Sequence, residues 1–182
     1  MLPTLTTERL LLRPWRAEDV DAAFAIYSLW EVQRHLGSHP RVDSDRAAAE
    51  ARVLRWAALA GPLHGVWAIV PEGSDRPVGS ALCKLLPRSG TGEPSTETEI
   101  GWHLHPDWWG RGYATEAGRR LLRHAADHGV GEVFAVTYPE NAASQAVCRR
   151  LGMEPLGLTD RYYDLECALF RVGTSAGSTT VA

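Results

Sequence analysis

The sequence has almost no lysine, little net charge and no long apolar segment. Lys84 is the only lysine among 19 basic residues, and the formal net charge is -3. This balance lacks the basic surface with which proteins hold nucleic-acid phosphates, so we predict no nucleic-acid partner. No segment approaches the roughly 18 consecutive apolar residues of a membrane span, so we expect no membrane association.

Cysteine is also scarce, and the positions of the cysteines do not suggest a disulfide framework. Cys83, Cys148 and Cys167 are odd in number and lack the spacing of a metal site. Reduced thiols and a cytoplasmic location are therefore expected. Glu8 and Arg9 interrupt any early apolar run, so the N-terminus lacks the pattern of a signal peptide.

Motifs of several enzyme classes are absent. There is no Gly-x-Ser-x-Gly segment of a serine hydrolase and no Gly-Lys-Ser/Thr segment of a P-loop. His103 with His105, and His124 with His128, could each pair two imidazoles, but no cysteine or carboxylate completes a recognised ligand set. We therefore predict no metal site.

What is present is a chain of alternating strand and helix patterns, 45% hydrophobic. Periodicity predicts strands at 9–15, 66–70, 78–86, 96–104, 133–138 and 165–172. Helices are predicted at 19–29, 44–58, 114–128 and 142–151, the second capped by Asp43 or Ser44 and the last by Asn141. Pro14 favours an edge position for the first strand. We expect one domain over 1–172 and a frayed tail at 173–182.

The order of these elements predicts an α/β (α+β) fold. The strand–helix–strand unit over 96–138 implies parallel strands, whereas the turn at 71–77 implies an antiparallel hairpin. The fold class is therefore a mixed central sheet of about six to seven strands with helices on both faces.

A turn with two glycines, Gly110 and Gly112, joins a half-polar strand to an alanine-rich helix. Glycines let backbone N–H groups approach an anion, and a helix N-terminus adds partial positive charge. The other two Gly-x-Gly segments lie in a loop and after a helix, where ordinary turns are expected. A dinucleotide fingerprint would need a third glycine where Thr115 stands. The turn therefore predicts a pyrophosphate site, and its spacing alone leaves an ordinary turn as the alternative.

The sequence of residues 108–117, Trp-Trp-Gly-Arg-Gly-Tyr-Ala-Thr-Glu-Ala, resembles the acetyl-CoA-binding motif of the GNAT superfamily of N-acetyltransferases. More narrowly, it is similar to the ribosomal-protein N-terminal alanine acetyltransferase branch. The resemblance extends over segments 7–14, 99–102, 141–144 and 151–153 in the family's order. Trp109 stands where the superfamily has Gln or Arg, and a tryptophan there is common in this branch.

The resemblance implies the GNAT fold, with acetyl-CoA as co-substrate. Its pantetheine arm would pair with the strand that ends at Leu104, and Asn141 and Ser144 would contact the arm near the sulfur. For the side chain of Arg111, a phosphate contact and a solvated surface position stay open. The pyrophosphate would be bound by backbone N–H groups of Trp109, Gly110, Arg111, Gly112, Tyr113, Ala114 and Thr115.

Acetyl transfer to an amine needs a base, because alkyl amines have a pKa near roughly 10 and are protonated at neutral pH. Glu99 is the leading candidate, since it lies on the polar face of the strand before the turn and the family often has a catalytic glutamate there. Glu97 and His103 share that face and are alternatives. Glu99 could instead be a solvent-facing or salt-bridged strand residue.

The departing thiolate gains from a proton donor. The superfamily often uses a tyrosine four residues before the glycine that corresponds to Gly152, but this chain has Cys148 there. Ser144, Cys148 and water are therefore the candidates. Ser144 matches a serine that this branch directs towards the sulfur.

The resemblance implies direct, sequential transfer of an acetyl group from acetyl-CoA to a primary amine, without an acyl-enzyme. The acceptor is a protein N-terminal α-amine or a small-molecule amine. The alternative is an acyl-CoA-binding sensor or scaffold without turnover. The loops at 29–43, 87–95 and 157–164 carry no pattern that names the acceptor, and the sequence leaves monomer and homodimer open.

Overall fold

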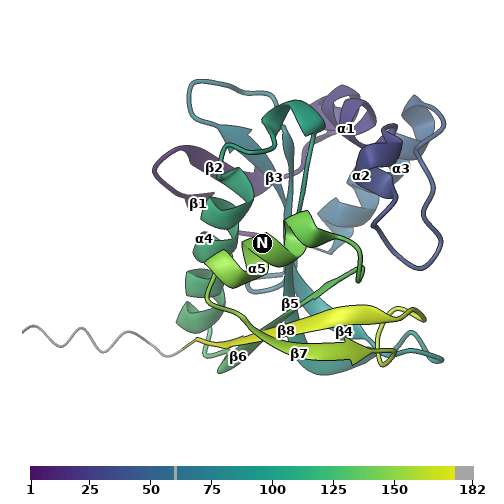
Figure 1. The fold of residues 1–182 in the computed structure, drawn as a ribbon. Coiled ribbons are helices and arrows are strands. Elements are labelled where there is room, and N and C mark those ends of the chain that lie inside the picture. Colours follow the sequence, from purple (N-terminus) through teal and green to yellow (C-terminus); the bar gives the residue numbers. More distant parts are fainter. Residues whose placement is uncertain (60, 175–182) are drawn as a thin grey trace, which may run out of the picture.

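The computed structural model describes residues 1–59 and 61–174, and these form one eight-stranded sheet with helices on both faces (Figure 1). The helices are α1 (Val20–Tyr27), α2 (Trp30–Gln33), α3 (Arg46–Ala58), α4 (Tyr113–Asp127) and α5 (Ala142–Arg150). The strands are β1 (Leu5–Thr6), β2 (Leu10–Pro14), β3 (Gly65–Pro71), β4 (Gly79–Pro87), β5 (Pro94–Leu104), β6 (Glu132–Thr137), β7 (Glu154–Thr159) and β8 (Cys167–Gly173).

The sheet is mixed, as predicted, and its spatial order is β1-β2-β3-β4-β5-β6-β8-β7. Only β5 and β6 run parallel, and their pairing is limited to Thr98 with Val133 and Glu99 with Phe134. β5 then continues for five residues to Leu104 without β6 beside it. The sheet is therefore split along the second half of β5.

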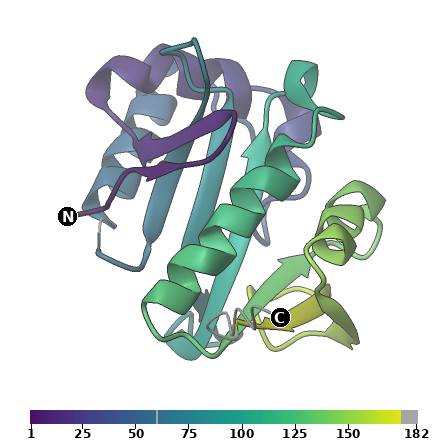
Figure 2. The ribbon, with the colours of Figure 1, turned by 90° about the vertical axis from the view of Figure 1, so that its left-hand side faces the viewer.

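Helices cover both faces, which confirms that part of the prediction. Alternate strand residues point to opposite faces, so Trp67 and Ile100 pack with Leu121 of α4, whereas Val66 and Leu82 pack with α1 and α3. α4 lies to the left of the sheet in Figure 1, with α1, α2 and α3 to the right. In Figure 2 α4 crosses in front of the sheet, and α5 lies to the right above β6, β7 and β8.

Eight strands exceed the six to seven predicted. β1 has only two residues, and the residues of β7 are exposed apart from the half-buried Thr159. β1 is too short and β7 too uniformly exposed to show the repeated alternation between buried and exposed positions by which a strand is recognised in a sequence. The four-residue α2 is likewise too short to show a helical period.

Two local predictions were wrong. Asp45 caps α3, because its Oδ1 accepts a hydrogen bond from Ala48 N at 2.9 Å, while the carboxylate of Asp43 binds Arg52 at 2.6 Å. β2 is not an edge strand, since it pairs with both β1 and β3. Pro14 is tolerated because β1 pairs only with Leu11 and Leu12, so no neighbour needs its missing N–H.

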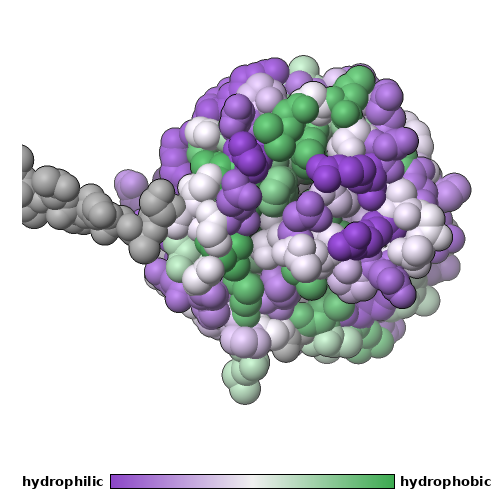
Figure 3. Space-filling view, turned by 90° about the horizontal axis from the view of Figure 1, so that it is seen from below, coloured by the Kyte–Doolittle hydropathy of each residue, from purple (hydrophilic) through white to green (hydrophobic). Residues whose placement is uncertain are grey.

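The C-terminal strand β8 extends to Gly173, one residue into the segment predicted as a tail. Thr174 of that segment also donates a backbone hydrogen bond to Gly131 O at 3.0 Å, and residues 175–182 lie outside the described residues. Within the described ranges, no helix is long and apolar enough to cross a membrane. The face seen in Figure 3 has several separate hydrophobic areas between hydrophilic ones.

Candidate active site

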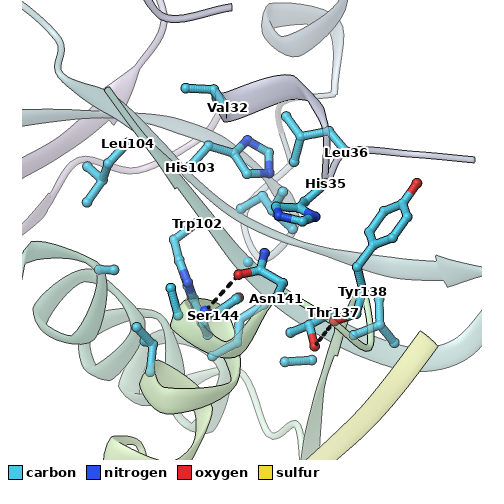
Figure 4. Close-up of a pocket in the computed structure, with 18 of the residues that line it drawn as sticks. Val32, His35, Leu36, Trp102, His103, Leu104, Thr137, Tyr138, Asn141 and Ser144 are labelled. Carbon is cyan, nitrogen blue, oxygen red and sulfur yellow. Dashed lines mark hydrogen bonds between the residues drawn. The ribbon is translucent and has the colours of Figure 1, made fainter. Parts of the chain in front are cut away.

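A cavity of about 840 Å³ lies where β5 and β6 separate. Its walls come from α2, β4, β5, the first turn of α4, the end of β6, the start of α5 and the loop before β8. Figure 4 shows His103 on the side of α2, and Trp102 on the side of Asn141 and Ser144. The cavity therefore reaches both faces of the sheet around the free edge of β5.

The predicted anion site forms one end of this cavity. Gly110 and Gly112 have φ values of 74° and 81°, which only glycine adopts readily, and Gly112 is the N-cap of α4. Within the described part of the chain, no backbone N–H of residues 110–115 donates a hydrogen bond. These groups lie at the positive end of the helix dipole, so they can bind an anion.

Trp109 contributes differently from the prediction. Its backbone N–H already donates to Pro106 O at 3.0 Å, so the row of free amides begins at Gly110. Its indole Nε1 donates to Leu104 O at 2.8 Å. The tryptophan thus ties the turn to the last residue of β5.

The edge of β5 is open beside the cavity. His105 N donates to Val78 O, and backbone groups of alternate strand residues point to opposite edges. The groups of Trp102 and Leu104 therefore point away from β4, towards the side that β6 has left. An extended ligand could pair with this edge as an added strand would.

A polar contact from the N-terminal segment supports the first turn of α4. Glu116 accepts hydrogen bonds from the Thr7 hydroxyl at 2.6 Å and Arg9 N at 2.9 Å, and it pairs with the Arg9 guanidinium. Desolvation alone would raise the pKa of Glu116, but these hydrogen bonds lower it overall. Arg111 does not line the cavity; its guanidinium carbon lies 4.7 Å from the centre of the Trp108 ring.

At the start of α5, Asn141 is the predicted N-cap: its Oδ1 accepts from Ser144 N at 3.1 Å. Both side chains line the cavity (Figure 4), and the Ser144 hydroxyl makes no hydrogen bond with another described residue. Cys148 is buried in the core beneath the cavity lining. Burial raises the pKa of its thiol to about 12.

Glu99 lies in the cavity wall but is only 6% exposed, so the solvent-facing alternative is wrong. Tyr163 donates a hydrogen bond to Oε2 of Glu99, and Lys84 is the residue directly opposite on β4. Desolvation raises the pKa of Glu99, and the charge of Lys84 and the Tyr163 hydrogen bond oppose part of that rise.

Of the other two candidate bases, only His103 shares the cavity. It is half-buried, with Nδ1 3.3 Å from the Tyr27 hydroxyl, which donates to Ser80 Oγ. Desolvation and the positive charges of Arg52 and Lys84 lower the pKa of His103 to about 3. Glu97 lines a separate hollow beside Arg88, Arg161 and Tyr162.

Sequence reasoning missed Tyr163 and Lys84 as members of the site. Tyr163 lies in a loop without periodicity, so no sequence pattern predicts its contact with a residue 64 positions away. Lys84 could be noticed as the only lysine, but only the sheet register places it opposite Glu99. In the described ranges, no three His, Cys, Asp or Glu side chains form a group that could hold a metal ion.

Free amides at a helix N-terminus, an open strand edge and a buried carboxylate meet in this cavity, an arrangement suited to an acyl-CoA-dependent transferase. Residues 9–154 match the family model described as acetyltransferase (GNAT) domain. The chain therefore belongs to the GNAT acetyltransferase family. It is an acyl-CoA-dependent N-acetyltransferase whose co-substrate is acetyl-CoA.

Individual relatives agree with this family. YoaA of Bacillus subtilis (strain 168), an uncharacterized N-acetyltransferase, is 26% identical over 164 residues, 89% of either chain. The FsC-acetyl coenzyme A-N(2)-transacetylase of Aspergillus fumigatus is 30% identical over 167 residues, 89% of this chain and 69% of the relative. The structure of RimL, a ribosomal alpha-N-protein acetyltransferase in complex with coenzyme A, superposes with a TM-score of 0.73. It is 16% identical, with 94% of this chain and 98% of that chain covered.

Proposed function

We propose that the protein transfers the acetyl group of acetyl-CoA directly to a primary amine, with Glu99 as general base. The observation that carries this proposal is that one cavity contains both the free amides of the glycine turn and the buried carboxylate of Glu99. A cofactor whose pyrophosphate lies on the turn can therefore extend its thioester towards a base within the same space.

The cofactor is held mainly by the backbone. The pyrophosphate accepts hydrogen bonds from the amides of Gly110 to Thr115, where the α4 dipole favours negative charge. The pantetheine arm pairs with the open edge of β5 up to Leu104, whose carbonyl is shared with Trp109. Asn141 keeps its side-chain N–H groups for the arm, since its oxygen caps α5.

The reaction needs one proton to leave the amine and one to reach sulfur. Glu99 accepts the amine proton as the nitrogen attacks the thioester carbon, and the C–S bond breaks when the tetrahedral intermediate collapses. Ser144 or water protonates the departing thiolate. Glu99 suits the role better than His103, because a group with a pKa of about 3 holds a proton poorly near neutral pH.

The acceptor enters beside α2, where Val32, His35 and Leu36 line the cavity (Figure 4). Two acceptor classes are supported by similar proteins: a protein N-terminus by RimL, an alpha-N-protein acetyltransferase, and a small-molecule amine by the N(2)-transacetylase. We further propose a reducing, cytoplasmic setting, which the three buried free cysteines support.

The test is release of free coenzyme A thiol from acetyl-CoA in the presence of a panel of N-terminal peptides and small amines, with acetyl-CoA binding measured by calorimetry. We expect binding without acceptor and thiol release with at least one amine class. Binding without release from any amine would instead support the sensor, and absence of binding would refute the proposed cofactor site.

A further inference from the structure

Tyr163 and Asp164 have a backbone conformation that such residues rarely adopt. Their φ values are 63° and 55°, and they are the only residues other than glycine with positive φ in the described part of the chain. Two successive left-handed residues are costly, so surrounding contacts must hold them, and such outliers concentrate at functional sites.

The contacts come from a clasp between two loops, the one at 88–93 and the one at 160–164. Ser89 Oγ donates to Asp160 O at 2.6 Å and accepts from Asp164 N at 3.0 Å. Gly90 N donates to the Asp164 carboxylate at 2.6 Å, and Ser89 N donates to Arg161 O at 2.8 Å. These bonds fix the backbone on both sides of Tyr163.

The clasp directs the Tyr163 side chain into the cavity. Its hydroxyl donates to Oε2 of Glu99, and Lys84 Nζ lies 4.9 Å from the centre of its ring. All three side chains line the cavity. The hydroxyl thus occupies one carboxylate oxygen and leaves Oε1 of Glu99 for a ligand.

We propose that Tyr163, held by the clasp, is a positioning residue that orients the carboxylate of Glu99 towards the acceptor amine and keeps it ionised. This inference rests on the proposed role of Glu99 as base. The hydroxyl replaces a hydrogen bond that the buried carboxylate would make with water. A hydrogen bond to the charged form favours that form. Of the other titratable groups on the elements packed around Glu99, Lys84 on β4 lies directly opposite it. Burial and the nearby charge of Glu99 raise the pKa of the Cys83 thiol on β4 and of the Cys167 thiol on β8, while Glu97 and His103 lie further along the same face of β5.

Tyr163→Phe removes one oxygen atom and tests the proposal directly. We expect kcat to fall about tenfold, as for loss of a hydrogen bond to a charged group. We also expect the acidic limb of the kcat–pH profile to move to higher pH, because loss of that bond raises the pKa of Glu99. The Kd for acetyl-CoA should not change. Unchanged kcat and an unchanged acidic limb would overturn the proposal.

Tyr162→Phe is the matched control, because the Tyr162 hydroxyl is buried without a hydrogen-bond partner among the described residues. It should leave both kcat and the profile as they are. Glu99→Gln separates the two proposals. If Glu99→Gln retains full kcat, Glu99 is not the base. If Glu99→Gln lowers kcat but Tyr163→Phe retains it, the positioning role of Tyr163 is wrong.

The clasp itself is tested at Asp164. Asp164→Ala removes the acceptor for Gly90 N and disfavours positive φ, so kcat should fall and the acidic limb should shift in the same direction as in Tyr163→Phe. Asp164→Asn keeps an oxygen acceptor and tolerates the left-handed conformation, so this variant should keep the wild-type kcat and the wild-type position of the acidic limb. Wild-type kcat in the folded Ala variant would refute the role of the clasp. If that variant does not fold, Tyr163→Phe still decides the proposal.

Discussion

The two ends of the cavity are built in different ways. The cofactor end comes mostly from one continuous segment, in which β5 ends, two glycines turn the chain and α4 begins. The base end combines Lys84 of β4, Glu99 of β5 and Tyr163 of the loop before β8. In the proposed function, cofactor binding thus depends on local backbone geometry, whereas the chemistry at the acceptor depends on tertiary contacts.

This difference predicts that substitutions at the two ends change different quantities. Variants of the cofactor end should weaken acetyl-CoA binding, and variants of the base end should lower kcat.

Glu99→Gln should lower kcat by about 10²- to 10⁴-fold, the usual contribution of a general base. The loss should be greatest at pH values between the pKa of Glu99 and that of the amine, where Glu99 is ionised and the amine is still protonated. Because burial raises the pKa of Glu99, wild-type kcat should fall as the pH decreases through a value above the ordinary ~4.3. Steady-state kinetics across pH measure kcat, and calorimetry with acetyl-CoA measures the Kd, which should stay unchanged. Glu97→Gln is the control, because Glu97 lines a separate hollow.

Gly112→Ala should raise the Kd for acetyl-CoA roughly tenfold, because a side chain at φ 81° costs about 1–2 kcal/mol and disturbs the amides before α4. The added Cβ would also lie 3.4 Å from Arg9 Nη2. At saturating cofactor, kcat should change little.

Gly129→Ala provides the control for Gly112→Ala at the other end of α4. Its φ is 76° and its added Cβ meets nothing within 4 Å, so stability should fall while acetyl-CoA affinity does not. Equal losses of affinity in the two variants would show that general destabilisation, and not the turn, governs binding.

Trp109→Phe keeps an aromatic ring but removes the indole donor to Leu104 O. One neutral hydrogen bond is lost, so we expect the Kd for acetyl-CoA to rise about threefold, with kcat retained. Trp30→Phe, at an exposed position outside the cavity, should have no effect. A large decrease in kcat for Trp109→Phe would contradict the separation of the two ends.

Glu116→Gln should cost about 1 kcal/mol in the free energy of unfolding at neutral pH, since it weakens charge-assisted bonds to Thr7 and Arg9. The folded-state pKa of Glu116 is lowered, so its stabilisation is present above its unfolded pKa and is lost as the pH falls through the folded value. Thermal unfolding at several pH values should therefore show a smaller difference between variant and wild type in acid. A difference that grows in acid would refute this contribution.

The same contrast explains what the sequence could predict. The strand ending at Leu104, the Gly110 to Gly112 turn, α4 and the Asn141 cap are encoded by short-range patterns, and all were predicted. The exposed strand β7 and the two-residue β1 lack such patterns, and both were missed.

The base end could be predicted only in part. Strand alternation placed Glu99 on the polar face of β5, but it could not show that this position is buried. The neighbours Lys84 and Tyr163 are set by sheet register and by hydrogen bonds between two loops, which leave no periodic trace in the sequence. The tertiary fold thus determines the burial of the Glu99 carboxylate and the charges around it, and therefore its pKa.

The single lysine has a practical consequence for chemical labelling. Since Lys84 carries the only side-chain amine and lines the cavity, an amine-directed reagent has one lysine target in the whole chain. The extent of Lys84 modification, measured by intact mass, should therefore report how far a bound ligand shields the base end of the cavity.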